Sequence, residues 1–251
     1  MGHHGRMHAQ PGVGLRPDAP WGYLPASSFR SRRSALSDAQ RQTWERLWPQ
    51  LGRQADTPPG ETPDAPLDTR AWFGRSAPLV LEIGCGSGTS TLAMAQAEPD
   101  IDVIAVEIYR RGLAQLLCAI DAEQVSNIRL VRGNGVDVLK DLIAPQSLTG
   151  VRVFFPDPWP KARHHKRRLL QSGTVSLIAD RLLPGGVLHA ATDHPGYAEH
   201  IGEVGDAESR LVRVGTDTES LPISISRPTT KYETKAQEAG SRVCEFVWKR
   251  I

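Results

Sequence analysis

The chain has 251 residues, of which 39% are hydrophobic, so it is long enough to bury the core of one large α/β domain or two small ones. It contains no apolar run near the roughly 20 residues that a membrane-spanning helix needs, and its N-terminus lacks the apolar segment of a secretory signal. The net charge of +2 indicates little, but basic residues concentrate at 30–33 and 161–168. Cys85, Cys118 and Cys244 are odd in number and widely spaced, which predicts reduced cysteines in a cytoplasmic protein.

The N-terminal part of the chain is predicted to be largely irregular. Residues 1–28 are rich in Gly, Pro and His, a composition typical of a disordered tail. The basic segment 29–33 is explained equally well by a solvated tail and by contact with an acidic partner. Ser37–Leu51 is predicted to be a helix, because an N-cap serine is followed three residues later by glutamine. The prolines between Gly52 and Pro78 predict a linker or an irregular surface loop.

From residue 79 to the end of the chain, segments typical of strands and helices alternate. Strands are predicted at 79–83, 103–108, 128–133, 151–155, 186–191, 209–215 and 242–249. Helices are predicted at about 88–97, 110–122, 136–143, 167–183 and 197–204. This order predicts an α/β domain over 79–251, with a doubly wound, mostly parallel seven-stranded sheet and helices on both faces. Ligands bind such sheets at the carboxyl ends of the strands.

The first of these strands ends in a glycine loop, Glu82-Ile83-Gly84-Cys85-Gly86-Ser87-Gly88. Glycines permit a tight turn and let the backbone approach a ligand closely. Because position 89 is Thr, the dinucleotide fingerprint G-x-G-x-x-G is not completed. The carboxylate of Glu82 repels a pyrophosphate but suits a cationic ligand, such as a sulfonium with an α-amino group.

Two further polar residues follow the next two strands. Glu107, about 20 residues past the glycine loop, is placed to accept hydrogen bonds from ribose hydroxyls. Asn134 follows the third strand, where an amide is placed to read an adenine edge. The alternative is a glycine-rich turn with two surface glutamates. The order of these residues favours a site for S-adenosylmethionine, with S-adenosylhomocysteine as the product, built from Glu82, Gly84, Gly86, Gly88, Glu107 and Asn134.

The stretch Val151–Leu170 begins as a buried strand and breaks at Pro156-Asp157-Pro158-Trp159-Pro160, because these prolines cannot continue a central strand or a helix. Asp157 is therefore a lone carboxylate at a strand end, and the flanking prolines restrict its orientations. Trp159 either stacks on a nucleic-acid base or packs against the domain.

A dense basic run follows this break, with five cations within the eight residues from Lys161 to Arg168. Such a run neutralises RNA phosphates, or else it forms a solvated basic helix start. Its two histidines lack a second cluster at ligand spacing, so a phosphate-facing role is favoured over a metal site. The candidates for contact with an RNA backbone are Arg163, His164, His165, Lys166, Arg167 and Arg168, extended by Arg30, Arg32 and Arg33.

These motifs together resemble one family. The glycine loop is similar to that of class I methyltransferases, and PDPWPKARHHKRR resembles the signature of the bacterial tRNA (guanine-N7-)-methyltransferases. Ala191-Thr192-Asp193 and Arg227-Pro228-Thr229-Thr230-Lys231-Tyr232-Glu233 resemble two further motifs of that family. The match covers roughly residues 29–250, less the linker. The resemblance implies a Rossmann-like class I methyltransferase fold with an antiparallel last strand.

The resemblance also implies roles for individual residues. Asp157 matches the family's catalytic aspartate, which also lies beside the cofactor, and Glu82, Glu107 and Asn134 match its cofactor contacts. The positions that match substrate contacts are Lys161, Asp193, Thr230, Lys231, Tyr232 and Glu233. Generic turn polarity also explains the last four, unless Asp193 and Glu233 approach the same pocket. The sequence departs from residues common in the family at Asn134, Pro160 and His194.

The implied activity is methyl transfer from S-adenosylmethionine to N7 of a variable-loop guanine in tRNA, without a metal. Guanine N7 already carries a lone pair, so catalysis depends on alignment, and Asp157 either positions the base or stabilises its positive charge. The expected partner is tRNA, with no obligate protein partner and a monomer or homodimer. The alternatives are methylation of another RNA or of an adenine amine, a non-catalytic tRNA-binding module and, disfavoured by Glu82, a nucleotide-dependent oxidoreductase.

Overall fold

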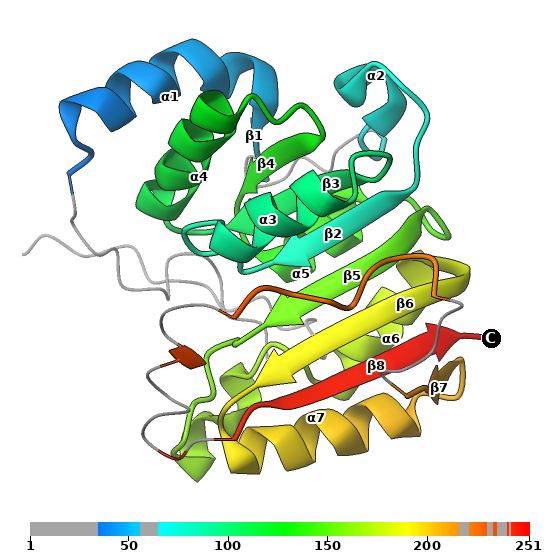
Figure 1. Ribbon diagram of the computed structural model, residues 1–251. Coiled ribbons are helices and arrows are strands. Elements are labelled where there is room, and N and C mark those ends of the chain that lie inside the picture. Colours follow the sequence, from blue (N-terminus) through cyan, green and yellow to red (C-terminus); the bar gives the residue numbers. More distant parts are fainter. Residues whose placement is uncertain (1–34, 56–64, 216–220, 230–232, 235–239, 241) are drawn as a thin grey trace, which may run out of the picture.

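The computed structural model describes residues 35–55, 65–215, 221–229, 233–234, 240 and 242–251. These residues build one eight-stranded sheet in the order β1-β4-β3-β2-β5-β6-β8-β7 (Figure 1). The strands are β1 Gly52–Gln54, β2 Leu79–Ile83, β3 Asp102–Glu107, β4 Ile128–Arg132, β5 Leu148–Phe154, β6 Leu182–Thr192, β7 Leu211–Arg213 and β8 Cys244–Arg250. The helices are α1 Asp38–Leu51, α2 Thr69–Phe73, α3 Thr89–Ala97, α4 Arg110–Glu123, α5 Gly135–Asp137, η2 Val138–Leu142, η3 Ala162–Arg167, α6 Ser172–Arg181 and α7 Pro195–Ala207.

The sheet is parallel except for one strand. Neighbouring strands from β1 across to β6 pair in parallel, whereas β8 is antiparallel to both β6 and β7. The predicted doubly wound fold with an antiparallel last strand is confirmed. From the centre of the sheet, the chain first moves outward from β2 to β4 and later outward from β5 to β7. The carboxyl ends of β2 and β5 therefore form the topological switch point, where such sheets bind ligands.

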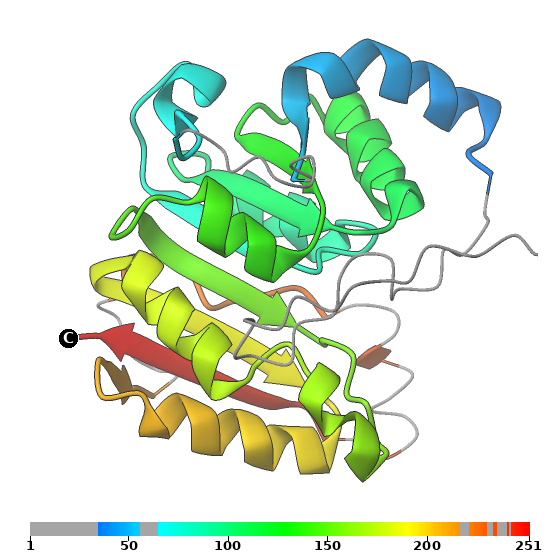
Figure 2. The same ribbon diagram turned by 180° about the vertical axis from the view of Figure 1, so that it is seen from behind.

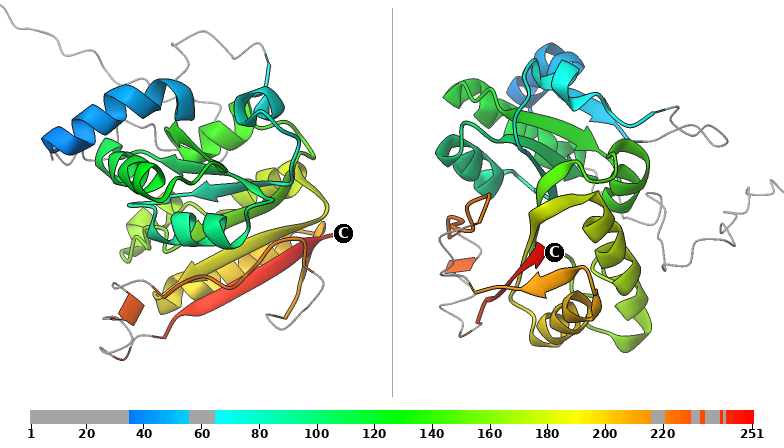
Figure 3. Two further views of the ribbon diagram at one scale, coloured as in Figure 1. Left: turned by 45° about the horizontal axis from the view of Figure 1, so that its top comes forward. Right: turned by 90° about the vertical axis from the view of Figure 1, so that its right-hand side faces the viewer.

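Helices cover both faces of the sheet (Figure 3). One face packs against α1, α3 and α4, and the other packs against η2, α6 and α7, which lie in front in the view from behind (Figure 2). All five residues of β2 are buried, which is typical of parallel strands covered on both sides. Within the described ranges, no helix has the length and apolar character that crossing a membrane requires.

The part of the chain before β2 contains more regular structure than we predicted. Helix α1 has the predicted capping box, in which Ser37 and Gln40 each accept from the other's backbone N–H. Directly after it, β1 pairs with β4 and adds an eighth strand that we did not predict. The three residues Gly52-Arg53-Gln54 carry no apolar alternation, so nothing local marks them as a strand. Helix α2 lies later in the same segment, and residues 56–64 lie outside the described residues.

The helix predicted over 167–183 begins later than expected. The basic run forms the 3-10 helix η3, and α6 starts five residues after η3 ends. Between them, the Leu170 N–H donates to the Tyr197 hydroxyl at 3.0 Å, and the Gln171 side chain donates to the His165 carbonyl at 2.7 Å. The Leu170 N–H is thus bonded to a side chain of α7 and not to a helical carbonyl, and this tertiary contact is why local propensity alone gives the wrong start.

Candidate active site

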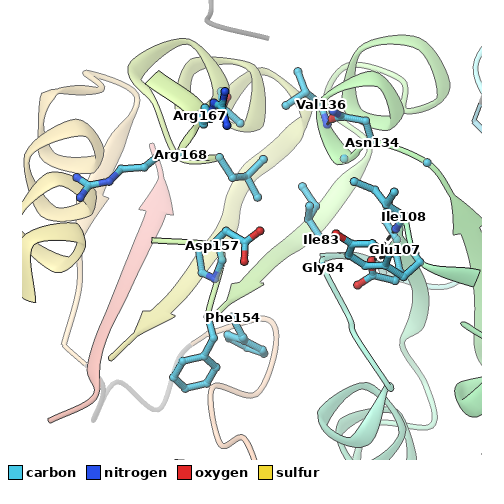
Figure 4. Close-up of a pocket in the computed structure, with 18 of the residues that line it drawn as sticks. Ile83, Gly84, Glu107, Ile108, Asn134, Val136, Phe154, Asp157, Arg167 and Arg168 are labelled. Carbon is cyan, nitrogen blue, oxygen red and sulfur yellow. Dashed lines mark hydrogen bonds between the residues drawn. The ribbon is translucent and has the colours of Figure 1, made fainter. Parts of the chain in front are cut away.

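A pocket of about 230 Å³ opens at the carboxyl ends of four adjacent strands, β4, β3, β2 and β5 (Figure 4). Each strand end supplies one residue singled out from the sequence: Gly84, Glu107, Asn134 and Asp157. Figure 4 shows the Asp157 carboxylate directed across the pocket toward the side that carries Glu107. The structure thus brings three of the predicted cofactor residues, which form the donor side of the pocket, and the predicted catalytic carboxylate to one cavity at the switch point. Gly86 and Gly88 do not line this cavity. The roles of the individual residues stay predictions.

The glycine loop after β2 adopts a backbone that needs glycine. Gly84, Gly86 and Gly88 have φ angles of 80°, 57° and 77°, in the left-handed region that other residues rarely adopt. Gly112 lets helix α4 lie directly against this loop, since a Cβ at Gly112 would be 2.2 Å from the Gly86 carbonyl oxygen. The loop conformation therefore depends on glycines in two separate segments.

The carboxylate of Glu107 ties the glycine loop to the end of β3. Its Oε2 accepts from the Gly86 N–H at 3.0 Å, and its Oε1 accepts from the N–H groups of Ile108 at 2.7 Å and Tyr109 at 3.0 Å. Hydrogen bonds to an ionised acceptor are stronger than neutral ones. A carboxylate offers about four acceptor positions, so Glu107 keeps about one position, on Oε2, for a further donor while it orders the loop.

Asn134 is fixed by its position as the N-cap of α5. Its Oδ1 accepts from the Val136 N–H at 2.8 Å, and its backbone carbonyl accepts from the Val138 N–H at 3.0 Å. The residue is only 8% exposed, yet it lines the pocket. A Cβ on the neighbouring Gly135 would be 2.3 Å from a methyl group of Ile83, so the start of α5 lies tightly against β2. The amide is therefore held at the pocket wall.

Glu82 lies beneath the glycine loop and does not line the pocket. Successive residues of a strand point to opposite faces of the sheet, and it is Ile83 that lines the pocket. Burial raises the pKa of Glu82, an effect that Arg152 and Thr91 oppose, and its Oε2 has no hydrogen-bond partner. A buried polar atom without a partner is costly unless a bound group satisfies it. Glu82 therefore remains a candidate for contact with the cationic end of a cofactor.

The loop that carries Asp157 has a strained backbone. Phe155 and Trp159 have φ angles of 50° and 44°, a conformation that costs about 1–2 kcal/mol in a residue other than glycine. Asp157 lies between them, exposed to solvent and at the pocket. Strain of this kind persists only where the surrounding structure imposes it. The contacts that hold this loop are therefore part of the site.

Arg168 supplies such contacts, and here the structure corrects a prediction. We expected Arg168 in the RNA-facing run, but it is only 4% exposed. Its Nε donates to the Pro158 carbonyl at 2.9 Å, and its Nη1 donates to the Gly196 carbonyl at 3.1 Å. The guanidinium also lies 4.8 Å from the centre of the Tyr197 ring, and Figure 4 shows it directed away from the pocket. Arg168 therefore fastens the Asp157 loop to α7.

The neighbours of Arg168 form an exposed cationic surface, which consists of Lys161, Arg163, Lys166 and Arg167. Arg167 lines the pocket and lies 5.1 Å from the centre of the Trp159 ring, which His164 meets edge-on at 5.9 Å. Trp159 therefore has packing partners and also lines the pocket. Desolvation and the surrounding cations lower the pKa of His164, and His165 is half-buried beside it. In the part of the chain that the structure describes, no group of three or more His, Cys, Asp or Glu side chains is arranged to hold a metal ion.

The residues predicted to contact the substrate are more dispersed. Asp193, after β6, and Lys161, before η3, do not line the pocket. Glu233 does not line it either, because its buried carboxylate pairs with both terminal nitrogens of Arg227, at 2.6 and 2.5 Å. Arg227 was not predicted as a site residue by itself, although it begins the matching motif. The predicted residues that lie outside the described part of the chain are Arg30, Arg32, Arg33, Thr230, Lys231 and Tyr232.

The strand order, the antiparallel β8, the glycine loop and the carboxylate at the end of β3 define the class I methyltransferase fold. A family model described as "Putative methyltransferase" matches residues 76–246. A solved 16S rRNA methyltransferase, KamB, is similar over 74% of this chain and 95% of its own, at 12% identity and a TM-score of 0.47.

Two relatives of higher similarity carry the name tRNA (guanine-N(7)-)-methyltransferase. The protein of Mycobacterium avium (strain 104) is 69% identical over 261 residues, which cover 100% of both chains. The protein of Mycobacterium bovis (strain BCG / Pasteur 1173P2) is 71% identical over 256 residues, which cover 100% of this chain and 96% of the relative. The chain belongs to the tRNA (guanine-N(7)-)-methyltransferase family.

Proposed function

We propose that this protein transfers a methyl group from S-adenosylmethionine to N7 of a guanine in the variable loop of tRNA. The observation that carries the proposal is a single pocket that joins Gly84, Glu107 and Asn134 to Asp157. Arg167 belongs both to this pocket and to the cationic surface, so a bound RNA backbone would lie beside the reacting base. The cytoplasmic location and the monomeric or dimeric state stay predictions.

The residues of the donor side fit S-adenosylmethionine. A Cβ at Gly84 or Gly86 would meet no other atom within 4 Å, so the loop leaves open space for a ligand that approaches its backbone. Glu107 would accept from a ribose hydroxyl at its remaining position, Asn134 would contact the adenine edge, and the unpartnered oxygen of Glu82 suits an ammonium group. When bound, S-adenosylmethionine supplies an electrophilic methyl group on a positively charged sulfur.

Asp157 acts on the acceptor side. Guanine N7 has no proton to lose, so a general base is not needed. The site has to align N7 with the methyl group and to stabilise the positive charge that develops on the base. A fixed carboxylate can accept hydrogen bonds from the N1–H and exocyclic amine of guanine, and it also stabilises the positive charge that methylation leaves on the base. The strained loop and the buried guanidinium of Arg168 restrict the orientations of this carboxylate.

The cationic surface of η3 would contact the phosphates of the tRNA. Lys161, Arg163, Lys166 and Arg167 are all exposed and lie within one short element or at its start. Each phosphate contact releases counterions, so binding would weaken as the salt concentration rises. A guanine that is stacked in folded tRNA has to be exposed before its N7 reaches the pocket.

The test is product mapping. The protein is incubated with unmodified tRNA and methyl-labelled S-adenosylmethionine, the RNA is digested, and the labelled nucleoside is identified and assigned to its position. We expect 7-methylguanosine from the variable loop. Label on an adenine amine, or no label from a folded protein that binds the methyl donor, would contradict the proposal.

A further inference from the structure

A buried charge cluster lies next to the end of β5. It is centred on Arg227, whose side chain is 5% exposed. The two terminal nitrogens of Arg227 donate to both oxygens of Glu233, and Nη2 also lies 2.6 Å from Oε1 of Glu245. Oε2 of Glu245 lies in turn 3.3 Å from Nε2 of the buried His189 on β6. One guanidinium is therefore held by two carboxylates, and one of these is anchored to His189 on β6.

The same guanidinium packs on the residues that lead to Asp157. It lies 5.7 Å from the ring centre of Phe154 and 5.0 Å from that of Phe155. The ring of His189 also meets Phe154 edge-on, at 4.8 Å. Both phenylalanines line the pocket, and Phe155 has the strained φ of 50° two residues before Asp157.

We propose that Arg227 is a positioning residue for methyl transfer. Glu233 and Glu245 fix its guanidinium, and the guanidinium holds the strained turn at Phe155, which sets the direction of the Asp157 carboxylate. This inference rests on the proposed function, because it assigns Arg227 to the reaction at Asp157. It differs from the substrate-contact role implied for Glu233, since here that carboxylate acts through Arg227.

The chemistry of the guanidinium suits this role. Its planar edge pairs with a carboxylate through two hydrogen bonds, and its flat faces stack on aromatic rings. A lysine ammonium keeps the charge but lacks both the fork and the flat face. Substitution of Arg227 by lysine therefore separates the need for a cation from the need for a guanidinium.

The experiment compares Arg227→Lys with Arg213→Lys. Arg213 is a matched control, because it also pairs with a carboxylate, Asp206, and stacks on two aromatic rings, Phe246 and Trp248, but it does not line the pocket. Single-turnover methylation of tRNA is measured with saturating S-adenosylmethionine, and each rate is normalised to the protein that binds the methyl donor. We expect Arg227→Lys to be about 100-fold slower, since small displacements of a reacting group have effects of that size.

A second readout separates positioning from a general loss of structure. The affinity for S-adenosylmethionine of both variants should stay within about twofold of the parent, because the hydrogen bonds, ion pairs and ring contacts described for Arg227 all lie on the acceptor side. If Arg227 acts through Phe155, then Phe155→Leu combined with Arg227→Lys should lose no more rate than the larger single loss. Additive losses in the double variant would overturn the inference.

The inference and the proposed function fail in different ways. If the parent protein forms no 7-methylguanosine in tRNA, the proposed function is wrong. If the parent protein methylates tRNA and Arg227→Lys keeps a normalised rate equal to that of Arg213→Lys, the proposed function stands and the positioning role of Arg227 is overturned.

Discussion

The two sides of the pocket are held in place by different means. On the donor side, the backbone fixes the shape of the pocket. Glycines adopt left-handed conformations, and the N–H groups of three residues donate to Glu107. On the acceptor side, Phe155 and Trp159 adopt left-handed conformations without being glycine, and buried arginines hold the loop.

Because the two sides are held differently, substitutions should affect donor binding and methyl transfer separately. The donor side is shaped by contacts of the glycine loop with Glu107 and Gly112, none of which involves the Asp157 loop, so it should bind its ligand even when the acceptor side is damaged. The acceptor side depends on contacts from α7 and from the segment before β8, which are distant in the sequence. Changes in those distant segments should therefore alter the rate of methyl transfer without altering donor affinity.

The largest effect should come from Asp157→Asn, which keeps the shape of the side chain and removes its charge. We expect the single-turnover rate to fall about 100- to 1,000-fold, as for the loss of one electrostatic contact to the reacting group. The affinity for S-adenosylmethionine, measured by calorimetry, should fall far less than the rate, because Gly84, Glu107 and Asn134 in the same pocket are unchanged. A variant that retains the full rate would remove Asp157 from the mechanism.

A comparable test of the donor side is Gly112→Ala. The added Cβ would lie 2.2 Å from the Gly86 carbonyl oxygen, so the glycine loop has to move. Overpacking of this kind costs about 1–3 kcal/mol, and we expect donor affinity to weaken about 10- to 100-fold in direct binding measurements.

The control for this substitution is Gly196→Ala, also near the start of a helix. There a Cβ would meet its nearest atom, in His194, at 3.6 Å, an ordinary contact. Donor affinity should then equal that of the parent. If Gly112→Ala also binds the donor normally, the close approach of α4 is not what shapes the loop.

The adjacent residues Arg168 and Arg167 give a contrast within the basic run. Arg168→Ala removes the hydrogen bonds that the buried guanidinium donates to the carbonyls of Pro158 and Gly196, and we expect the free energy of unfolding in urea to fall by about 2 kcal/mol. Arg167→Ala should leave this free energy unchanged and reduce the salt dependence of tRNA binding by about one phosphate contact. Equal effects of the two substitutions on stability would contradict the separation between buried and exposed cations.

The smallest predicted effect is a dependence of protein stability on pH, which comes from His189 in the buried charge cluster next to the end of β5. Burial lowers the pKa of His189 below its ordinary value of 6.5, against the opposing influence of Glu245. The unfolded chain then binds a proton below pH 6.5 that the folded chain does not bind, so stability is complete above that pH and falls as the pH drops.

Urea unfolding at about pH 7.5 and about pH 5.5 should show a loss on the order of 1 kcal/mol. His189→Asn removes this proton uptake and should reduce the loss. Burial also lowers the pKa of His200, so part of the loss should remain. An unchanged loss in His189→Asn would show that His189 is not held neutral in the folded protein.

Local sequence signals explain why the donor side was predictable. A glycine in a left-handed turn, a carboxylate at a strand end and an N-capping asparagine are each visible in a few consecutive residues. The seven predicted strands are present for the same reason, because each has its own apolar run. The exception is β1, whose three residues have no apolar pattern and are a strand only because β4 lies beside them.

The acceptor side was predictable only in outline. Asp157 was recognisable at the break in its strand, but Arg168 is one of several consecutive cations, and burial distinguishes it only in the folded chain. The conformations of Phe155 and Trp159 run against their residue types, so sequence patterns predict the opposite. The pairing of Arg227 with the end of β5 joins residues more than 70 positions apart, and no local pattern reveals it.

The most direct measurement compares two transcripts of the same tRNA, one with guanosine and one with 7-deazaguanosine. The analogue replaces N7 and its lone pair with a C–H group, while it preserves the Watson–Crick edge and the phosphate backbone. We predict that the two transcripts bind with similar affinity, and that label from S-adenosylmethionine enters the guanosine transcript alone. Equal labelling of both transcripts would contradict methyl transfer to guanine N7 in this pocket.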